Sequence, residues 1–217
     1  MVDYSARRLM MVDTQVRPSD VTKFPIIDAM LEVPREVYVP DALREAAYMG
    51  ENLDLGGGRV VLEPRTLAKM LEVLDVQPSH VVLDLGCGLG YTTAVLAMLA
   101  DFVVGVEDDA DLARDAQTNL SEQGVHNAAV MENPLADGSA KSGPYDIIIT
   151  QGAVEQIPAA ICDQLREGGR IACIFAENSL GVVRVGHKLN GDINWRFAFN
   201  ASAPTLKGFE KAQNFAL

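Results

Sequence analysis

Cysteine and metal-binding patterns are sparse in this 217-residue sequence. It has three cysteines, Cys87, Cys162 and Cys173, and no Cys-x-x-Cys pair. An odd number without such pairs favours neither a disulfide framework nor a zinc site, so we expect reduced thiols in a cytoplasmic protein. The three histidines are not spaced as metal ligands, and we expect no metal.

Long apolar runs and excess positive charge are also missing. The longest apolar stretch, around 93–100, is far shorter than the ~20 residues that a membrane helix needs. The N-terminus lacks the basic segment and apolar run of a secretory signal. The net charge of −12 argues against nucleic acid and against an anionic membrane surface. We therefore expect neither as a partner, and the sequence does not indicate an oligomeric state.

Apolar residues make up 48% of the chain, enough for a sizeable core. Residues 1–78 form an expected helical extension with a glycine-rich loop at 55–59, and residues 79–217 an α/β core, the two being one globular unit. In the extension, apolar spacing and proline positions predict helices over 6–17, 26–31, 41–48 and 65–74.

The expected core alternates strands with helices. Short apolar runs predict strands over 81–85, 102–107, 128–131, 145–150 and 170–175, and the segments between them predict helices over 91–100, 111–123 and 158–166. This alternation predicts a mostly parallel sheet with right-handed crossovers. Asn190-Gly191 between two β-like runs then predicts a C-terminal antiparallel hairpin. The segment after Pro204 gives no clear signal.

A glycine-rich loop follows the first predicted strand and opens a helix. It reads Asp84-Leu85-Gly86-Cys87-Gly88-Leu89-Gly90. Glycine accepts positive φ and lets a ligand approach, and the helix N-terminus presents free N–H groups. Dinucleotides and nucleosides such as S-adenosylmethionine both use such loops. The dinucleotide pattern is G-x-G-x-x-G, whereas this loop is G-x-G-x-G with Tyr91 at the next position.

Two carboxylates favour S-adenosylmethionine. Asp84 precedes the glycines and can receive the ligand's amino group, directly or through water. Glu107 ends the second predicted strand, where a carboxylate can accept both ribose hydroxyls. With the hairpin signal, these features predict a Rossmann-like S-adenosylmethionine-dependent methyltransferase fold. A tight turn without a ligand and a nicotinamide enzyme are the alternatives.

The N-terminal zone carries more specific motifs. Residues 11–17 read Met-Val-Asp-Thr-Gln-Val-Arg, residues 29–40 read Ala-Met-Leu-Glu-Val-Pro-Arg-Glu-Val-Tyr-Val-Pro, and Ala47-Tyr48 follow. With the glycine loop and the following Tyr91, they make the chain from about 6 to 175 resemble the protein-L-isoaspartate O-methyltransferases.

The resemblance implies a repair activity on damaged proteins. Members methylate the side carboxylate of isoaspartyl residues, and the ester re-forms a succinimide that can hydrolyse to normal aspartyl. The cofactor implied is S-adenosylmethionine, and the partner is a protein or peptide with isoaspartyl residues. We nominate no catalytic residue, because the enzyme mainly aligns oxygen, methyl carbon and sulfur. The candidate cofactor-binding residues are Asp84, Gly86, Cys87, Gly88, Gly90, Tyr91, Thr92, Glu107, Asp108, Glu132, Asn133 and Gln151.

The chain departs from the family in the substrate-side loop. The family reads Gly-Gln-Thr-Ile-Ser-Gln-Pro, and the aligned residues after Gly58 are Arg59, Val60, Val61, Leu62 and Glu63, then Pro64. The family's serine hydroxyl lies beside the reacting carboxylate, and leucine cannot donate a hydrogen bond. Glu63 is expected to repel an anionic substrate. Arg59 is expected to be a solvated loop arginine, with attraction of an anionic substrate as the alternative.

The adenine side departs too. The family's Gly-Asp-Gly, whose Asp contacts the adenine amine, is replaced by Glu132-Asn133-Pro134-Leu135. We expect the Asn133 side-chain oxygen or Glu132 to take over the adenine contact, and Gln151 to line the cofactor pocket. These departures keep a second hypothesis open, a divergent paralogue that binds S-adenosylmethionine or S-adenosylhomocysteine but lacks isoaspartyl activity or uses another substrate.

Overall fold

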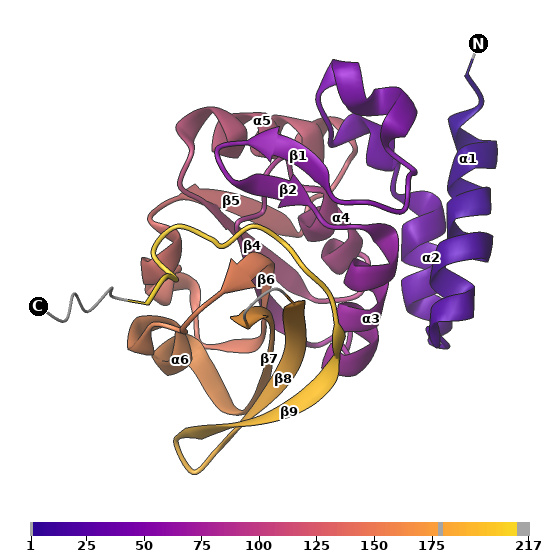
Figure 1. Ribbon diagram of the computed structural model, residues 1–217. Coiled ribbons are helices and arrows are strands. Elements are labelled where there is room, and N and C mark those ends of the chain that lie inside the picture. Colours follow the sequence, from indigo (N-terminus) through magenta and orange to yellow (C-terminus); the bar gives the residue numbers. More distant parts are fainter. Residues whose placement is uncertain (1, 178–179, 212–217) are drawn as a thin grey trace, which may run out of the picture.

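The computed structural model describes residues 2–177 and 180–211. A seven-stranded sheet in the order β5-β4-β3-β6-β7-β8-β9 forms its centre (Figure 1). Its strands are β3 (Val81–Leu85), β4 (Phe102–Glu107), β5 (Ala128–Glu132), β6 (Tyr145–Val154), β7 (Leu165–Glu177), β8 (Leu180–Leu189) and β9 (Asp192–Asn200). The first five pair in parallel, and β8 and β9 are antiparallel to their neighbours. The predicted α/β class, with a mostly parallel sheet and a C-terminal hairpin, is confirmed.

Alternate residues of the strands face two separate apolar clusters. Val82, Val103 and Ile147 pack on one face with α3 (Pro64–Leu74), α4 (Tyr91–Ala97) and the N-terminal helices. Leu83, Val104 and Ile148 pack on the other face with α6 (Ala159–Gln164) and the C-terminal tail. The central strands β3, β4 and β6 are buried on both sides, as expected for a parallel sheet between helices.

The N-terminal extension contains three kinds of helix. It begins with α1 (Tyr4–Met11), which continues as a π-helix (Val12–Val16) and a 3-10 turn (Arg17–Ser19). The second α-helix, α2 (Phe24–Glu32), includes the predicted 26–31. Short 3-10 helices follow at Arg35–Val37 and Asp41–Ala46. The predicted helix over 41–48 is thus a 3-10 helix that ends at 46.

The glycine-rich loop at 55–59 is the turn of a hairpin that was not predicted. Two short antiparallel strands, β1 (Leu53–Gly56) and β2 (Arg59–Val61), flank it. Strands this short carry too little periodicity to be recognised. Pro64 begins α3 as expected.

The C-terminal part contains the predicted antiparallel hairpin and a docked tail. Asn190 and Gly191 join β8 to β9 with φ values of 55° and 86°, which an Asn-Gly turn of this kind requires. Trp195 packs edge-on against Phe175 with the ring centroids 4.9 Å apart, which supports the hairpin against β7. The tail (201–211) then returns across the end of β6 (Figure 1), where Ala153 bonds to Pro204 and Leu206.

Within residues 2–177 and 180–211, no helix is long and apolar enough to cross a membrane. Within the same residues, no group of three or more His, Cys, Asp or Glu side chains is placed to hold a metal ion. The helix α5 (Ala110–Glu122) has Asp109 as its N-cap, and the Asp109 side chain accepts from the N–H groups of Asp111 and Leu112.

Candidate cofactor site

The glycine loop lies where the order of the sheet reverses. After β3 the chain places β4 on one side and β6 on the other, and ligands of open α/β sheets bind at the carboxyl ends of strands at such a point. Gly86, Gly88 and Gly90 all have positive φ, at 77°, 56° and 95°. Gly90 is the N-cap of α4. The loop thus has the backbone geometry that the sequence predicts for a nucleoside site.

Asp84 lies beneath this loop and is fully buried. Its Oδ2 accepts from the Thr93 hydroxyl at 2.7 Å and its Oδ1 from the Gln151 amide at 2.7 Å. Gln151 in turn accepts from Thr92 at 2.8 Å. Burial raises the pKa of Asp84 to about 7, while the Thr93 and Gln151 hydrogen bonds act in the opposite direction. The structure brings three predicted residues together here, and adds Thr93, which sequence reasoning missed.

Glu107 joins the end of β4 to the glycine loop. Its Oε2 accepts from the Gly88 N–H at 2.9 Å, and its Oε1 accepts from the Asp108 N–H at 2.9 Å. The carboxylate is completely shielded from solvent, and this burial raises its pKa. A third partner, the Arg59 Nε at 2.9 Å, stabilises the ionised form and partly offsets the cost of burial.

The position of Arg59 corrects the expectation of a solvated loop arginine. Arg59 is only 3% exposed, and its guanidinium bridges Glu107 and Asp108. The physical reason is that two adjacent carboxylates at the end of β4 attract the one cation that the β1–β2 hairpin carries across the sheet edge. The sequence signal for this contact was the replacement of the family's Gln by a cation at position 59. Arg59 is 48 residues from Glu107 in the sequence, so the signal did not identify the partner.

Two leucines lie against the glycines of this loop. The Leu55 Cδ1 lies 2.7 Å from where a Cβ on Gly88 would be. On the other side, the Leu206 Cδ2 lies 3.2 Å from the corresponding point on Gly86 and 2.6 Å from that on Gly152. Side chains of the hairpin and the tail therefore pack close to the loop glycines.

Cys87 and Tyr91 are both buried and touch protein neighbours. The Cys87 Sγ packs against Gly105 of β4. The Tyr91 ring lies under the Arg35 guanidinium, 4.7 Å from its centroid, and 6.0 Å from the Tyr38 ring. Tyr91 therefore connects the glycine loop to the N-terminal extension.

The expected adenine side contains a cavity of about 410 Å³ beyond the end of β4. Glu132, Asn133, Asp108 and Lys207 are among its lining residues. The Asn133 N–H donates to the Glu107 carbonyl at 3.0 Å, and its side-chain amide donates to the Gly138 carbonyl at 2.7 Å. Three predicted residues, Asp108, Glu132 and Asn133, thus line this cavity together with Lys207.

The substrate-side loop is mostly buried. Val60, Val61 and Leu62 are each less than 8% exposed. The Leu62 carbonyl accepts from Arg35 at 2.8 Å. The Glu63 carboxylate accepts from the Thr66 hydroxyl at 2.5 Å, so its charge is turned toward the first turn of α3. Leucine at the family's serine position therefore supports packing.

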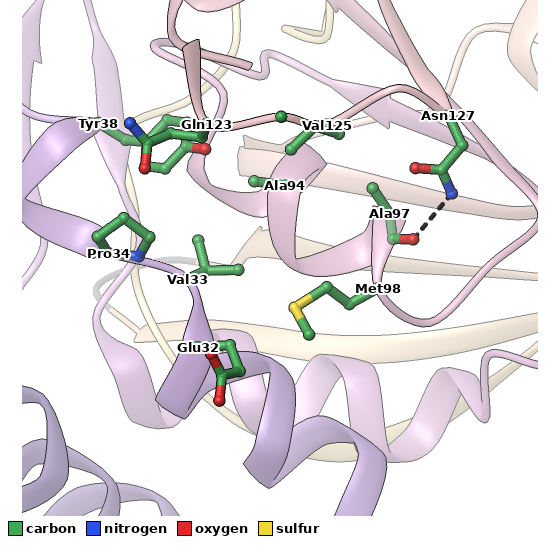
Figure 2. Close-up of a pocket in the computed structure, with 11 residues that line it drawn as sticks. Glu32, Val33, Pro34, Tyr38, Ala94, Ala97, Met98, Gln123, Val125 and Asn127 are labelled. Atoms are coloured by element: carbon green, nitrogen blue, oxygen red, sulfur yellow. Dashed lines mark hydrogen bonds between the residues drawn. The ribbon is translucent and has the colours of Figure 1, made fainter. Parts of the chain in front are cut away.

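A different cavity, of about 340 Å³, lies between the end of α2 and the end of α4 (Figure 2). Glu32, Tyr38, Met98 and Gln123 are among the residues around it. Asn127 closes one side by donating to the Ala97 carbonyl at 2.8 Å. None of the predicted cofactor or substrate residues lines this cavity, so we place the candidate site at the glycine loop.

The polar groups of the crevice suit S-adenosylmethionine. Glu107 offers acceptors for ribose hydroxyls, Asp84 offers a carboxylate beneath the loop, and the positive-φ glycines permit close approach. Arg59 contacts the same carboxylate, and Leu55 and Leu206 lie against the same glycines.

Comparison with known proteins agrees with the fold and the motifs. The family model described as Protein-L-isoaspartate(D-aspartate) O-methyltransferase matches residues 8–198. A protein-L-isoaspartate O-methyltransferase of Syntrophus aciditrophicus is 34% identical over 192 residues, which are 88% of each chain. Another, from Alteromonas mediterranea, is 38% identical over 148 residues, which are 67% of this chain and 70% of the relative.

Solved structures show the same fold. A protein-L-isoaspartate O-methyltransferase superposes with a TM-score of 0.80 at 22% identity, over 95% of this chain and 66% of the other. A Plasmodium falciparum protein in complex with S-adenosyl-L-homocysteine also gives 0.80 at 20% identity, over 95% and 99%. The predicted family resemblance is confirmed, and the chain belongs to the protein-L-isoaspartate(D-aspartate) O-methyltransferase family.

Proposed function

We propose that this chain is an S-adenosylmethionine-dependent O-methyltransferase that esterifies isoaspartyl carboxylates of damaged cytoplasmic proteins. Family membership supports the reaction class, and the three free cysteines are compatible with a reducing compartment. The observation that carries the proposal is the hydrogen bond from Gly88 to Glu107 at the point where the order of the sheet reverses. A carboxylate and a loop amide lie together there, which supports a nucleoside site.

The reaction needs alignment more than acid–base catalysis. S-adenosylmethionine supplies a methyl group already activated by its sulfonium. A substrate carboxylate oxygen forms the new C–O bond as the C–S bond breaks, and the electron pair stays on sulfur as a neutral thioether. No proton is transferred, so the protein's contribution is to bind, orient and exclude water. In this proposal Glu107 holds the ribose, and Asp84 holds the amino group directly or through water.

The second candidate is a paralogue that binds the cofactor without acting on isoaspartyl residues. The observation that favours it is the burial of Leu62, 1% exposed, where the family has a hydroxyl beside the reacting carboxylate. A site without this donor is expected to lose a few kcal/mol of transition-state stabilisation, about 3 kcal/mol for a typical oxyanion donor.

One assay separates the two candidates. The chain is incubated with methyl-labelled S-adenosylmethionine and either an isoaspartyl peptide or the matched aspartyl peptide. Base-labile label on the isoaspartyl peptide alone supports the proposed function. Thermal stabilisation by S-adenosylhomocysteine without transfer to either peptide supports the paralogue and contradicts the proposed substrate.

A substitution in the substrate-side loop tests the same point from the other direction. The double change Leu62→Ser and Glu63→Gln restores the family's residues, and we expect it to increase isoaspartyl methylation about tenfold or more. Leu62→Ala with Glu63→Gln is the matched control, since it opens a similar cavity without a hydroxyl. Equal rates in the two double variants would show that the hydroxyl does not matter.

A further inference from the structure

The bridge from Arg59 to the end of β4 involves the atoms that a ribose would use. The Arg59 Nε lies 2.9 Å from the Glu107 Oε1, and its Nη2 contacts the Asp108 carboxylate. A second cation, Lys207, also lies near the end of β4, with its Nζ 3.9 Å from the Asp108 Oδ2. A nucleoside that hydrogen-bonds to Glu107 therefore competes directly with Arg59.

Apolar contacts lie beside this bridge. Leu55 is close to Gly88, and Leu206 is close to Gly86 and Gly152. Leu206 is fully buried, and its N–H donates to the Ala153 carbonyl at 2.8 Å, which fixes the tail along the end of β6. Phe209, also fully buried, holds the same tail further on through its carbonyl, which accepts from Glu155 and Gln156.

We propose that Arg59, Leu55 and Leu206 form an autoinhibitory latch, and that the chain binds its nucleoside cofactor only when this latch opens. The β1–β2 hairpin supplies Leu55 and Arg59, and the C-terminal tail supplies Leu206. Closing and cofactor binding are mutually exclusive because both use Glu107 and the space above the glycines. The inference rests on the proposed function only in taking an S-adenosyl nucleoside as the ligand.

The latch lowers the apparent affinity by the fraction of molecules that are open. The apparent dissociation constant is the intrinsic constant divided by this fraction. A change that weakens the closed state therefore tightens binding without any new contact to the ligand. In the family motif the residue at position 59 is Gln, which has no charge to pair with Glu107.

The test measures S-adenosylhomocysteine binding by calorimetry, which requires no turnover. Arg59→Gln is expected to bind S-adenosylhomocysteine about tenfold more tightly than the parent chain, or better. Arg65→Gln is the matched control, because Arg65 lies six residues away, is 46% exposed and contacts only Glu63 at 3.9 Å among the ion pairs of the described residues. Its affinity is expected to equal that of the parent.

A second variant and a second measurement protect the test against misfolding. Glu107 keeps N–H donors from Gly88, Asp108 and Asp109 after the change at Arg59, and circular dichroism verifies the fold. Leu206→Ala removes the other half of the latch and is also expected to tighten binding. In the parent chain, saturating S-adenosylhomocysteine is expected to speed hydrogen exchange of the Leu206 amide.

The outcomes separate this proposal from the proposed function. Unchanged or weaker affinity in both Arg59→Gln and Leu206→Ala would overturn the latch, as would slower exchange at Leu206 in the bound state. If the parent then still methylates the isoaspartyl peptide, the proposed function stands without the latch. A lack of S-adenosylhomocysteine binding by the parent and both variants would overturn the latch and the proposed function together.

Discussion

The glycine loop and the β1–β2 hairpin both donate hydrogen bonds to Glu107, but the loop does so through its backbone and the hairpin through a side chain. The loop reaches it with a backbone N–H, from Gly88, and its glycines match the family pattern. The hairpin reaches it with a side chain, Arg59, at a position where the family has Gln. Both are rich in glycine, and both contain residues with positive φ.

The difference shows how a divergent member can retain one half of a site and alter the other. A loop that works through backbone amides keeps its geometry as long as the glycines remain. A loop that works through side chains changes its chemistry with each substitution. With Arg59 in place of the family's neutral residue, a segment expected to face the substrate contacts Glu107 instead.

Removing the charge of Glu107 should affect stability most. Glu107→Gln leaves Arg59 buried with only Asp108 as an anionic partner, and we expect a loss of about 3 kcal/mol in the free energy of unfolding, measured in urea. Adding Arg59→Gln to this variant should recover part of the loss, because the unpaired cation is gone. Strictly additive losses would contradict a coupled ion pair.

The buried carboxyl of Asp84 should make stability depend on pH. Its pKa is raised to about 7 in the folded state, above the unfolded value of 3.8, so the folded chain binds the proton more strongly. The carboxyl therefore favours folding below about pH 4, and this contribution is lost as the pH rises through about 7. Asn cannot ionise, so the melting temperature of Asp84→Asn should rise relative to that of the parent chain by about 5 °C as the pH increases from 5 to 8.

That comparison cancels the titration of all other groups, since both chains share them. A difference in melting temperature that stays constant between pH 5 and pH 8 would show that Asp84 does not titrate in this range. A difference that changes in favour of the parent would reverse the sign of the effect.

The smallest expected effect is the difference in stability between alanine substitutions in the two glycine-rich segments. Gly57 and Gly88 have nearly the same φ, 59° and 56°, so alanine strains both by about 1 kcal/mol. A Cβ at Gly57 meets nothing within 4 Å, whereas one at Gly88 meets Leu55 at 2.7 Å. Gly88→Ala should therefore cost about 1 kcal/mol more than Gly57→Ala in urea unfolding. In a Leu55→Ala background this excess should disappear, and its persistence would argue against the Leu55 contact.

Local patterns predicted the central elements well. The bounds of β3 and β4 match the prediction residue for residue, and the Asn190-Gly191 turn lies where it was expected. Each of these segments has a strong signal within a few neighbouring residues. By contrast, β6 and β7 extend beyond the predicted ends, because their pairing partners, and not their own sequences, determine their length.

The site was predicted unevenly for the same reason. Asp84 and Gln151 lie on the neighbouring strands β3 and β6, and Thr92 lies in the first turn of α4, so these three predicted residues meet at one edge of the sheet. Arg59 was expected to be solvated because the sequence around it does not contain the carboxylates with which it pairs in the structure. Its partner is 48 residues away.

The sequence by itself determined the fold class, the position of the glycine loop and the family, since these rest on periodicity, turn residues and motifs read over short spans. Only the tertiary structure decided what covers the loop. Arg59 meets Glu107, and Leu206 meets Gly86, through contacts between segments far apart in the chain. Such contacts depend on how the hairpin and the tail pack over the sheet, and no local pattern of residues encodes that packing.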